Sequence, residues 1–311
     1  MEKDVDTDFE VLEHWDREAA EKAAELARDY DPDLPDYLRE LLDAYWFAPP
    51  VALWRAVELR AMAAKGVYEP PLLDLGCGDG KVARVLFGTG GKVDVGLDIW
   101  PEQLRQAADS DVYRHVDMAD AASMPYPDAF FATVVSNSVL EHIPDVLPVV
   151  REVRRVLAPG GHFVFSIPSD AFREFLDGYV QRRERGDIKG AEAYATAVDT
   201  RLAHYHYFAQ AEWQRLLGAA GLEMVEAHYY MPQQVEQEWD RMNGRYGIGR
   251  WSPWKLLVSS RLRFLGYQDA LRRWVVDRLS EHWRSYYEII LPPGEKGGGM
   301  IIVARRESRW Y

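Results

Sequence analysis

The feature that most constrains the fold is a short apolar strand that runs directly into alternating glycines. Residues 72–80 read Leu-Leu-Asp-Leu-Gly-Cys-Gly-Asp-Gly, and the helix-forming segment Lys81–Phe87 follows. Glycines here let the backbone turn sharply and approach a ligand closely beside a helix N-terminus. The next apolar run, Val93–Leu97, ends in Asp98, twenty-two residues after Gly76. An acidic side chain at that place can accept hydrogen bonds from both hydroxyls of a ribose.

Short apolar runs alternate with helical patterns along most of the chain. Strands separated by helices are typical of parallel βαβ units, whose sheet is covered by helices on both faces. The sequence therefore predicts an α/β protein with a doubly wound sheet of seven strands. The predicted strands cover residues 72–75, 93–97, 112–116, 132–136, 162–167, 222–230 and 300–305.

Three further blocks follow the glycine loop in order, and together with it they resemble class I S-adenosylmethionine-dependent methyltransferases over residues 72–168. Motif I of that family reads acidic-x-Gly-x-Gly-x-Gly, whereas the nicotinamide fingerprint reads Gly-x-Gly-x-x-Gly. Ala132 departs from the family's usual Asp, at a position that is normally structural. The resemblance implies a Rossmann-like core and S-adenosyl-L-methionine as cofactor. The blocks are Val116–Met118 with Met124–Asp128, Val134–His142 with Ile143–Asp145, and Val153–Ile167.

The resemblance assigns the methionine and ribose parts of the cofactor to the first two strands. Asp74, or a backbone group beside it, would meet the methionyl ammonium. The loop Gly76, Cys77, Gly78 and Gly80 would pass under the methionine and the ribose. Asp98 would hold the ribose hydroxyls.

The adenine and the sulfonium are assigned to the later blocks in the same way. Asp117 would bind the adenine amine, and Ile99 and Met118 would face its ring. Ser136 or Asn137 would lie beneath the sulfonium. Each of these side chains also has a purely structural interpretation, as a loop cap or as part of the core.

The chain is expected to divide into a core and helical additions. Residues 1–65 are predicted to be a helical segment that covers the cofactor cleft, with one helix over 10–29. The methyltransferase core takes 66–231 and 298–311, of which 169–208 belongs to a lid. Residues 232–297 are predicted to be a helical insertion that completes the lid, because no Gly/Ser linker precedes them.

Three histidines are the candidate catalytic residues. A general base is needed only if the acceptor stays protonated at neutral pH, as a hydroxyl does. His142 ends the fourth-strand block, nearest the expected methyl, while His204 and His206 precede the helix predicted over 209–220. These histidines favour O-methylation over N-methylation, although a structural role is favoured over catalysis for each: packing or hydrogen bonding for His142, and anchoring of the lid for His204 and His206. No metal site is expected, because no third ligand lies near His204 and His206 at a recognisable spacing.

The acceptor is predicted to be a small molecule. Nucleic-acid amine methylation is typical of Asn/Asp-Pro-Pro-Tyr after the fourth strand, where this chain reads Ser136-Asn137-Ser138-Val139. Pyrimidine C5 methylation needs a cysteine after that strand, and the single cysteine is Cys77. The net charge of −13 also disfavours nucleic acid as a partner.

Aromatic and basic residues near the C-terminus are expected to shape the acceptor site. Arginines there would suit an anionic or lipid-linked acceptor, but arginines spread in this way more often form a solvated helix face. Trp251–Leu265 fits either a membrane-surface segment or the core of the lid. The predicted acceptor contacts are Tyr205, Arg241, Arg245 and Trp251.

Two other functions remain open from the sequence alone. A protein or peptide methyltransferase would need an open groove, and a cofactor-binding interaction protein would need no acceptor site. The chain has no apolar run long enough to span a bilayer and no signal-peptide pattern, so a cytoplasmic location is expected. The identity of the acceptor and the oligomeric state are not predicted.

Overall fold

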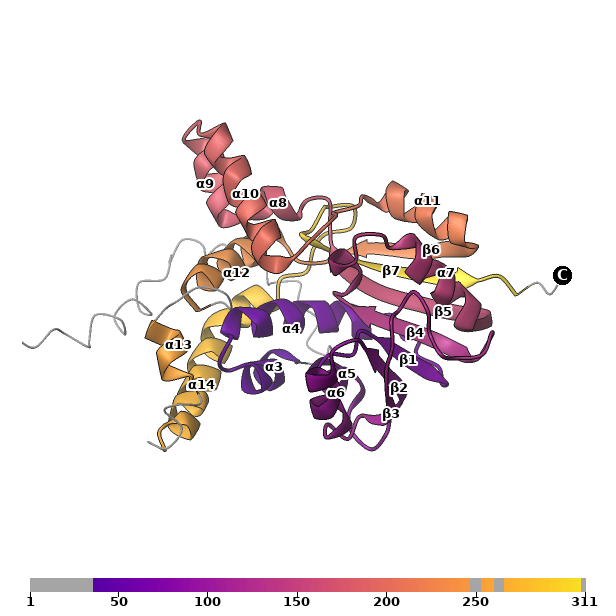
Figure 1. Ribbon diagram of the computed structural model, residues 1–311. Helices are drawn as coiled ribbons and strands as arrows, with labels where there is room; N and C mark the ends of the chain where they lie inside the picture. Colours follow the sequence, from indigo (N-terminus) through magenta and orange to yellow (C-terminus); the bar gives the residue numbers. More distant parts are fainter. Residues whose placement is uncertain (1–35, 247–252, 260–265, 309–311) are drawn as a thin grey trace, which may run out of the picture.

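A seven-stranded sheet lies at the centre of the protein (Figure 1). The computed structural model describes residues 36–246, 253–259 and 266–308. The strand order β3-β2-β1-β4-β5-β7-β6 confirms the predicted doubly wound α/β fold. The strands are β1 (Leu72–Leu75), β2 (Val93–Asp98), β3 (Tyr113–Met118), β4 (Phe131–Asn137), β5 (Leu157–Pro168), β6 (Leu222–Tyr229) and β7 (Gly299–Arg306).

The sheet is parallel except at its β6–β7 edge. Strand β7 runs antiparallel to both β5 and β6, while β1 pairs in parallel with β2 on one side and with β4 on the other. Asp74 in β1 lies opposite Gly96 in β2 and Val135 in β4. The strand order reverses at β1 and β4, and such a point leaves a crevice at the carboxyl ends of the strands. The glycine loop after β1 enters that crevice.

Helices cover both faces of the sheet because the core strands are apolar on both sides. All four residues of β1 are buried. Leu72 packs into the core under α4 and α5, whereas Leu73 and Leu75 pack into the core under α7 and α11. The helices before β6 are α3 (Leu38–Ala44), α4 (Pro49–Ala63), α5 (Lys81–Phe87), α6 (Pro101–Ala108), the 3-10 helix η2 (Leu140–His142), α7 (Leu147–Val156), α8 (Phe172–Phe175), α9 (Asp177–Glu184), α10 (Ile188–Leu202) and α11 (Gln210–Ala220).

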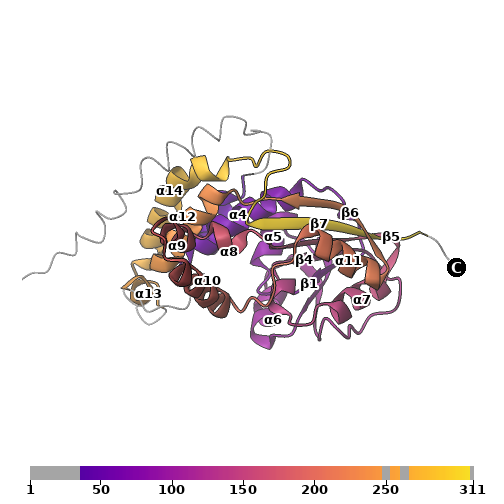
Figure 2. The same cartoon turned by 90° about the horizontal axis from the view of Figure 1, so that it is seen from above.

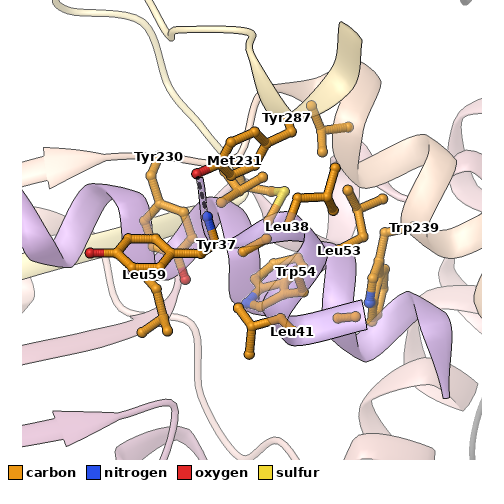
Figure 3. Close-up of a cluster of buried hydrophobic side chains, with 14 of the residues drawn as sticks. Tyr37, Leu38, Leu41, Leu53, Trp54, Leu59, Tyr230, Met231, Trp239 and Tyr287 are labelled. Atoms are coloured by element: carbon orange, nitrogen blue, oxygen red, sulfur yellow. Dashed lines mark hydrogen bonds between the residues drawn. The ribbon is translucent and has the colours of Figure 1, made fainter. Parts of the chain in front are cut away.

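The core under α4 and α5 also joins the helices near the N-terminus to those near the C-terminus (Figure 3). The ring of Trp54 in α4 lies 5.2 Å from Trp239 and 6.3 Å from Tyr230, centroid to centroid. The backbone N–H of Tyr37 donates a 3.0 Å hydrogen bond to the hydroxyl of Tyr287. These contacts fix the start of α3 and the helix α4 against segments that lie far along the chain. The helices after β6 are α12 (Gln233–Tyr246), α13 (Pro253–Leu257) and α14 (Gln268–Tyr287).

Figure 2 shows α8, α9, α10, α12, α13 and α14 gathered at one end of the molecule, with α7 and α11 at the other. Helix α11 ends where the sequence predicts, because Gly221 adopts the left-handed conformation at φ 81°. Helix α4 begins at Pro49, since proline is tolerated in a first helical turn. The helix predicted over 10–29 lies outside the described residues. Among the helices that are described, none combines the length and the apolar character needed to cross a bilayer.

Candidate active site

A cleft of about 940 Å³ opens at the carboxyl ends of β1, β2 and β4. It is the crevice that the strand order predicts, and it is closed on one side by α4. The sequence-predicted residues that line it are Asp74, Gly76, Cys77, Gly78, Asp98, Ile99, Asn137, His142 and Tyr205.

The glycine loop fits so tightly under the loop after β4 that a side chain is excluded. Gly76 has φ 77°, and a Cβ built on it would lie 2.4 Å from Cγ2 of Val139. The backbone N–H groups of Gly76 and Cys77 donate to the carbonyl of Leu97, at 2.8 and 3.0 Å. The loop is therefore fastened to the end of β2, with its backbone exposed to the cleft.

Asp98 connects the glycine loop to the start of α6. Its Oδ2 accepts a 2.9 Å hydrogen bond from the N–H of Gly78, and its Oδ1 accepts one of 2.9 Å from the N–H of Trp100. Because carboxylate oxygens accept more than one hydrogen bond each, Asp98 can still bind hydroxyl groups. The carboxylate is held at a fixed place in the cleft wall.

Asp74 lies on the floor of the cleft. It is 6% exposed, and its Oδ2 accepts a 2.6 Å hydrogen bond from the hydroxyl of Tyr113. Burial raises the pKa of Asp74 to about 6, against the opposing effect of that hydrogen bond. Burial likewise raises the pKa of the Cys77 thiol well above its usual range, so this cysteine stays protonated and unreactive.

Large apolar side chains stand exposed beside Asp98. Ile99 is 55% exposed, Trp100 62% and Met118 64%. Exposed apolar surface at the mouth of a cleft is typical of a site for a flat ligand. Ile99 and Trp100 line the cleft, whereas Met118 lies on the neighbouring strand without lining it.

Four predicted cofactor residues lie outside the cleft lining: Gly80, Asp117, Met118 and Ser136. Asp117 accepts a 3.1 Å hydrogen bond from the hydroxyl of Tyr126, and Ser136 is fully buried and donates to the carbonyl of Leu75 at 3.0 Å. The cleft instead reaches the next residues of the third-strand block, Ala119 and Asp120.

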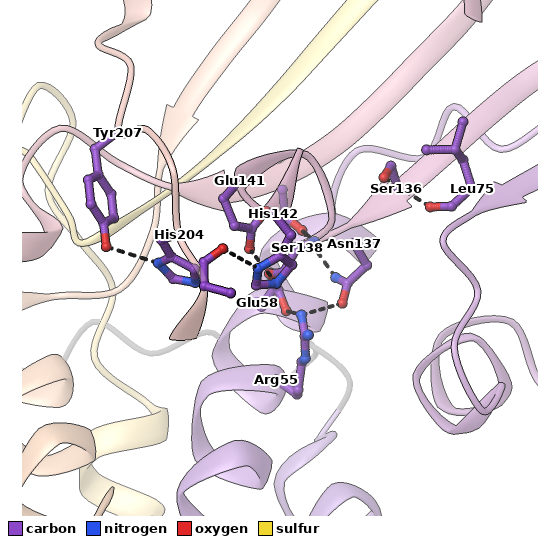
Figure 4. A network of polar contacts seen from close by, with 12 residues as sticks. Arg55, Glu58, Leu75, Ser136, Asn137, Ser138, Glu141, His142, His204 and Tyr207 are labelled. Atoms are coloured by element: carbon purple, nitrogen blue, oxygen red, sulfur yellow. Dashed lines mark hydrogen bonds and ion pairs between the residues drawn. The ribbon is translucent and has the colours of Figure 1, made fainter. Parts of the chain in front are cut away.

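A polar network from α4 forms part of the cleft wall (Figure 4). Nη1 of Arg55 donates to Oδ1 of Asn137 at 2.5 Å and to Oε2 of Glu58 at 2.6 Å. Oε1 of Glu58 accepts from the hydroxyls of Ser138, at 2.6 Å, and Tyr230, at 3.0 Å. Ser138 has φ 48°, an uncommon conformation for a residue with a side chain. The network holds the loop after β4 in that conformation and places a guanidinium at the cleft.

Sequence reasoning missed Arg55 and Glu58. The available signal was the presence of three charged residues, Arg55, Glu58 and Arg60, within the otherwise apolar stretch Val51–Met62. A charge inside an apolar helix is seldom fully buried without a partner, so these residues indicate buried polar contacts.

The structure brings two of the three candidate histidines together. The rings of His142 and His204 lie 5.1 Å apart, centroid to centroid (Figure 4). Burial lowers the pKa of both imidazoles, and that of His204 falls to about 3 because burial is reinforced by the neighbouring histidines. Both rings are therefore neutral at physiological pH. His142 lines the cleft, and His204 lies behind it against Phe172.

Glu141 joins this pair and was not predicted. Its Oε1 lies 3.9 Å from Nε2 of His142, and its side chain is 3% exposed. Burial raises the pKa of Glu141 to about 8. His206, in contrast, donates from Nε2 to the carbonyl of Ile143 at 3.0 Å and stacks on Phe208 at 4.3 Å.

The predicted acceptor contacts are distributed over two regions. Tyr205 lies on the rim of the cleft and is 62% exposed. Arg241 is paired with Glu238 at 3.1 Å and with Asp177 at 3.4 Å. None of the described residues between 232 and 297 lines the cleft. The side chain of Arg245 and the whole of Trp251 lie outside the described residues.

The strand order, the glycine loop and the acidic residue that ends β2 define the fold and cleft of a class I S-adenosylmethionine-dependent methyltransferase. The methyltransferase-domain family matches residues 73–165. The 27-O-demethylrifamycin SV methyltransferase of Amycolatopsis mediterranei is 32% identical over 241 residues, which cover 71% of this chain and 82% of that protein. The chain belongs to this methyltransferase family, and it is an enzyme that uses S-adenosylmethionine.

The chain is also similar to two further proteins. The malonyl-[acyl-carrier protein] O-methyltransferase of Geobacter sulfurreducens is 28% identical over 221 residues, which cover 68% of this chain and 78% of that protein. The crystal structure of an S-adenosylmethionine-dependent methyltransferase from Mesorhizobium loti is 18% identical, covers 80% of this chain and 96% of its own, and has a TM-score of 0.43.

Proposed function

We propose that this enzyme transfers the methyl group of S-adenosylmethionine to a hydroxyl group of a small-molecule acceptor. The observation that carries the proposal is His142, a neutral imidazole that lines the cleft and is backed by His204 and the buried Glu141. A hydroxyl acceptor needs a neighbouring group that takes up its proton, whereas an unprotonated amine can attack the methyl group without one. Both named relatives described above also methylate oxygen, according to their names.

The cleft fits the cofactor in size and in chemistry. Its volume of about 940 Å³ exceeds the roughly 300 Å³ at which ligand clefts begin. Asp98 would hold the ribose, and the flat apolar surface of Ile99 and Trp100 would face the adenine. A side chain at Gly76 would collide with Val139, which lines the same cleft, so glycine keeps the loop in its place there.

The methionine end of the cofactor would lie over Asp74, between the glycine loop and α4. The carboxylate of Asp74 would meet the ammonium group. Arg55 would meet the carboxylate, since its guanidinium lines the same cleft and only Nη1 is engaged by Asn137 and Glu58. Arginine suits this role because its planar fork binds carboxylates with two hydrogen bonds.

When bound, the cofactor supplies a methyl group on a sulfonium, whose sulfur departs as a neutral thioether. The protein has to hold the acceptor oxygen in line with that methyl and keep water out. His142 is the member of its cluster that reaches the cleft, so the acceptor hydroxyl would lie against it. Tyr205 on the rim would contact the rest of the acceptor.

The helical additions would act as walls and supports around this site. We assign residues 1–65 to the cover of the cleft, 169–208 to the lid and 232–297 to a helical insertion, around a core of 66–231 and 298–311. The packing of α12 and α14 against α3 and α4 supports this division. The insertion would then stabilise the cover from behind.

The experiment that tests the proposal is transfer of a labelled methyl group. The enzyme is incubated with methyl-¹³C S-adenosylmethionine and a cell extract split into small-molecule and macromolecular fractions. The ¹³C chemical shift of the product distinguishes methyl on oxygen, nitrogen and carbon. We expect an O-methyl signal in the small-molecule fraction. Label on nitrogen or carbon, label in the macromolecular fraction, or no transfer at all would contradict the proposal.

A further inference from the structure

Three potential metal ligands converge at the end of β4. One ligand atom each from Glu141, His142 and His204 lie within 4.8 Å of one another. Glu141 and His142 come from η2, and His204 from the loop after α10. The sequence predicts no metal site because it shows no third ligand near the histidines. The structure supplies Glu141, which lies more than sixty residues before His204.

The hydrogen bonds of both imidazoles leave the Nε2 lone pairs free. Nδ1 of His142 lies 3.1 Å from the carbonyl of Ala203, which can only accept, so the proton is assigned to Nδ1. Nδ1 of His204 lies 3.0 Å from the hydroxyl of Tyr207, whose own hydrogen is donated to Asp199 at 2.6 Å. His204 therefore also carries its proton on Nδ1. Metal-binding histidines are typically fixed in this way, with the other ring nitrogen donating to a carbonyl or carboxylate system.

Glu141 supplies the independent observation. Its side chain is 3% exposed, and its Oε2 has no hydrogen-bond partner among the described residues. A buried polar atom without a partner is costly, and buried carboxylates are normally paired with a cation or coordinate a metal. The other oxygen of the same carboxylate, Oε1, faces Nε2 of His142 at 3.9 Å.

The charges around the cluster also suit a cation. Arg55 is the positive group nearby, and Glu58 pairs with it at 2.6 Å. Because burial raises the pKa of Glu141 to about 8, an ion that binds at neutral pH would displace its proton, and the set of Arg55, Glu58 and Glu141 would then carry one net negative charge. The two histidines add none, because they are neutral.

We propose that Glu141, His142 and His204 form a binding site for a divalent transition-metal ion such as zinc. Two imidazoles and one carboxylate are a recognised ligand set for catalytic zinc, which keeps a further position open. Bonds of about 2.0–2.2 Å require the donors to move closer together than they lie now. His142 can do so by turning its side chain, which is 42% exposed. The open position would face the cleft that His142 lines.

The site deepens the proposed function and rests on it for its chemical consequence. A hydroxyl bound to such an ion loses its proton more readily, and the proton leaves to solvent through the cleft. His142 and His204 would then act as ligands. Ion binding itself requires neither the cofactor nor an acceptor, so it can be tested separately.

The test is calorimetric titration of the untagged full-length chain with zinc chloride after removal of metals by a chelator. We expect one ion per chain, with affinity lowered roughly a hundredfold or more in His142→Gln and His204→Gln, because each removes one of three ligands. The matched control is His206→Gln, which alters a neighbouring imidazole outside the cluster and should retain wild-type affinity. Thermal unfolding without metal confirms that each variant is folded.

Two additional readouts sharpen the result. Cobalt(II) should give visible absorption bands in the wild type that are absent from His204→Gln. Tyr207→Phe, which removes the oxygen that fixes the His204 ring, should weaken binding by roughly ten- to a hundredfold. Absence of stoichiometric zinc binding, or equal binding in both histidine variants and the wild type, would overturn the site. Either result would leave methyl transfer to a hydroxyl intact, and that is decided by the label experiment alone.

Discussion

The hydroxyl of Ser138 donates a 2.6 Å hydrogen bond to Oε1 of Glu58, a fully buried carboxylate in the N-terminal helix α4. This bond joins a helix before the core to the loop that follows β4, which forms one wall of the cleft. The same carboxylate accepts from Arg55 and Tyr230. One side chain therefore fixes the position of α4, the conformation of the loop and the guanidinium at the cleft.

Loss of Glu58 should destabilise the protein strongly. Glu58→Ala would leave Arg55 without its charged partner, and the buried hydroxyl of Tyr230 and the half-buried hydroxyl of Ser138 without an acceptor, at a cost of about 3–5 kcal/mol in the free energy of unfolding. Urea denaturation measures this change. Glu102→Ala is the control, since it removes an exposed ion pair with Arg105 and should change stability by less than about 0.5 kcal/mol. Equal effects of the two substitutions would contradict the role given to Glu58.

Gly76→Ala should disrupt the glycine loop. The new Cβ would meet Val139 at 2.4 Å, at a φ of 77° that alanine rarely adopts. We expect a loss of about 2–4 kcal/mol in the free energy of unfolding, with weaker cofactor binding. Gly218→Ala, on an open face of α11, should instead stabilise by about 0.5–1 kcal/mol. A stable Gly76→Ala variant with normal cofactor affinity would show that the loop is not packed as described.

Cofactor affinity should depend on the ionisation of Asp74. Burial raises its pKa to about 6, so the carboxylate is ionised above that pH and protonated below it. Only the ionised form attracts an ammonium group, and affinity for S-adenosylmethionine should therefore fall about tenfold from pH 7.5 to pH 5. Asp74→Asn should bind weakly at both values and lack this dependence. If the variant keeps the wild-type pH profile, Asp74 does not bind the ammonium group.

The histidine cluster should be required for turnover and dispensable for cofactor binding. His142→Ala and His204→Ala are each expected to lower the methyl-transfer rate by about 10²–10⁴-fold, because the hydroxyl proton is no longer removed efficiently. The affinity for S-adenosylhomocysteine should change little. His228→Ala in β6 serves as the control and should keep both properties. Near-normal turnover in both cluster variants would show that the acceptor needs no help in losing a proton.

The sequence predicts well those features that rest on neighbouring residues. The strand that leads into Gly76, the acidic residue that ends β2 and the glycine stop of α11 all have local signals, and the structure contains each of them. Their physical causes act within a few residues: backbone freedom at glycine, alternation of apolar side chains, and the start or end of a helix.

Features built from distant residues were not accessible in this way. Arg55 binds Asn137 across 82 positions, and Glu58 binds Tyr230 across 172. Glu141 was overlooked because its candidate role rests on its burial and on its closeness to His204. Neither property leaves a pattern in the sequence around Glu141. The cofactor contact of Asp117, indicated by a family position, stays a prediction, and its carboxylate accepts a hydrogen bond from Tyr126 beside the cleft lining.

Binding of S-adenosylhomocysteine, measured by calorimetry, tests the central claim most directly. If the cleft at the ends of β1, β2 and β4 holds the cofactor through Asp98, then Asp98→Ala should lower the affinity at least tenfold, or about 1.5–3 kcal/mol. Asp109→Ala, an exposed residue at the end of α6, should bind like the wild type. Unchanged affinity in a folded Asp98→Ala variant would contradict the placement of the cofactor in this cleft.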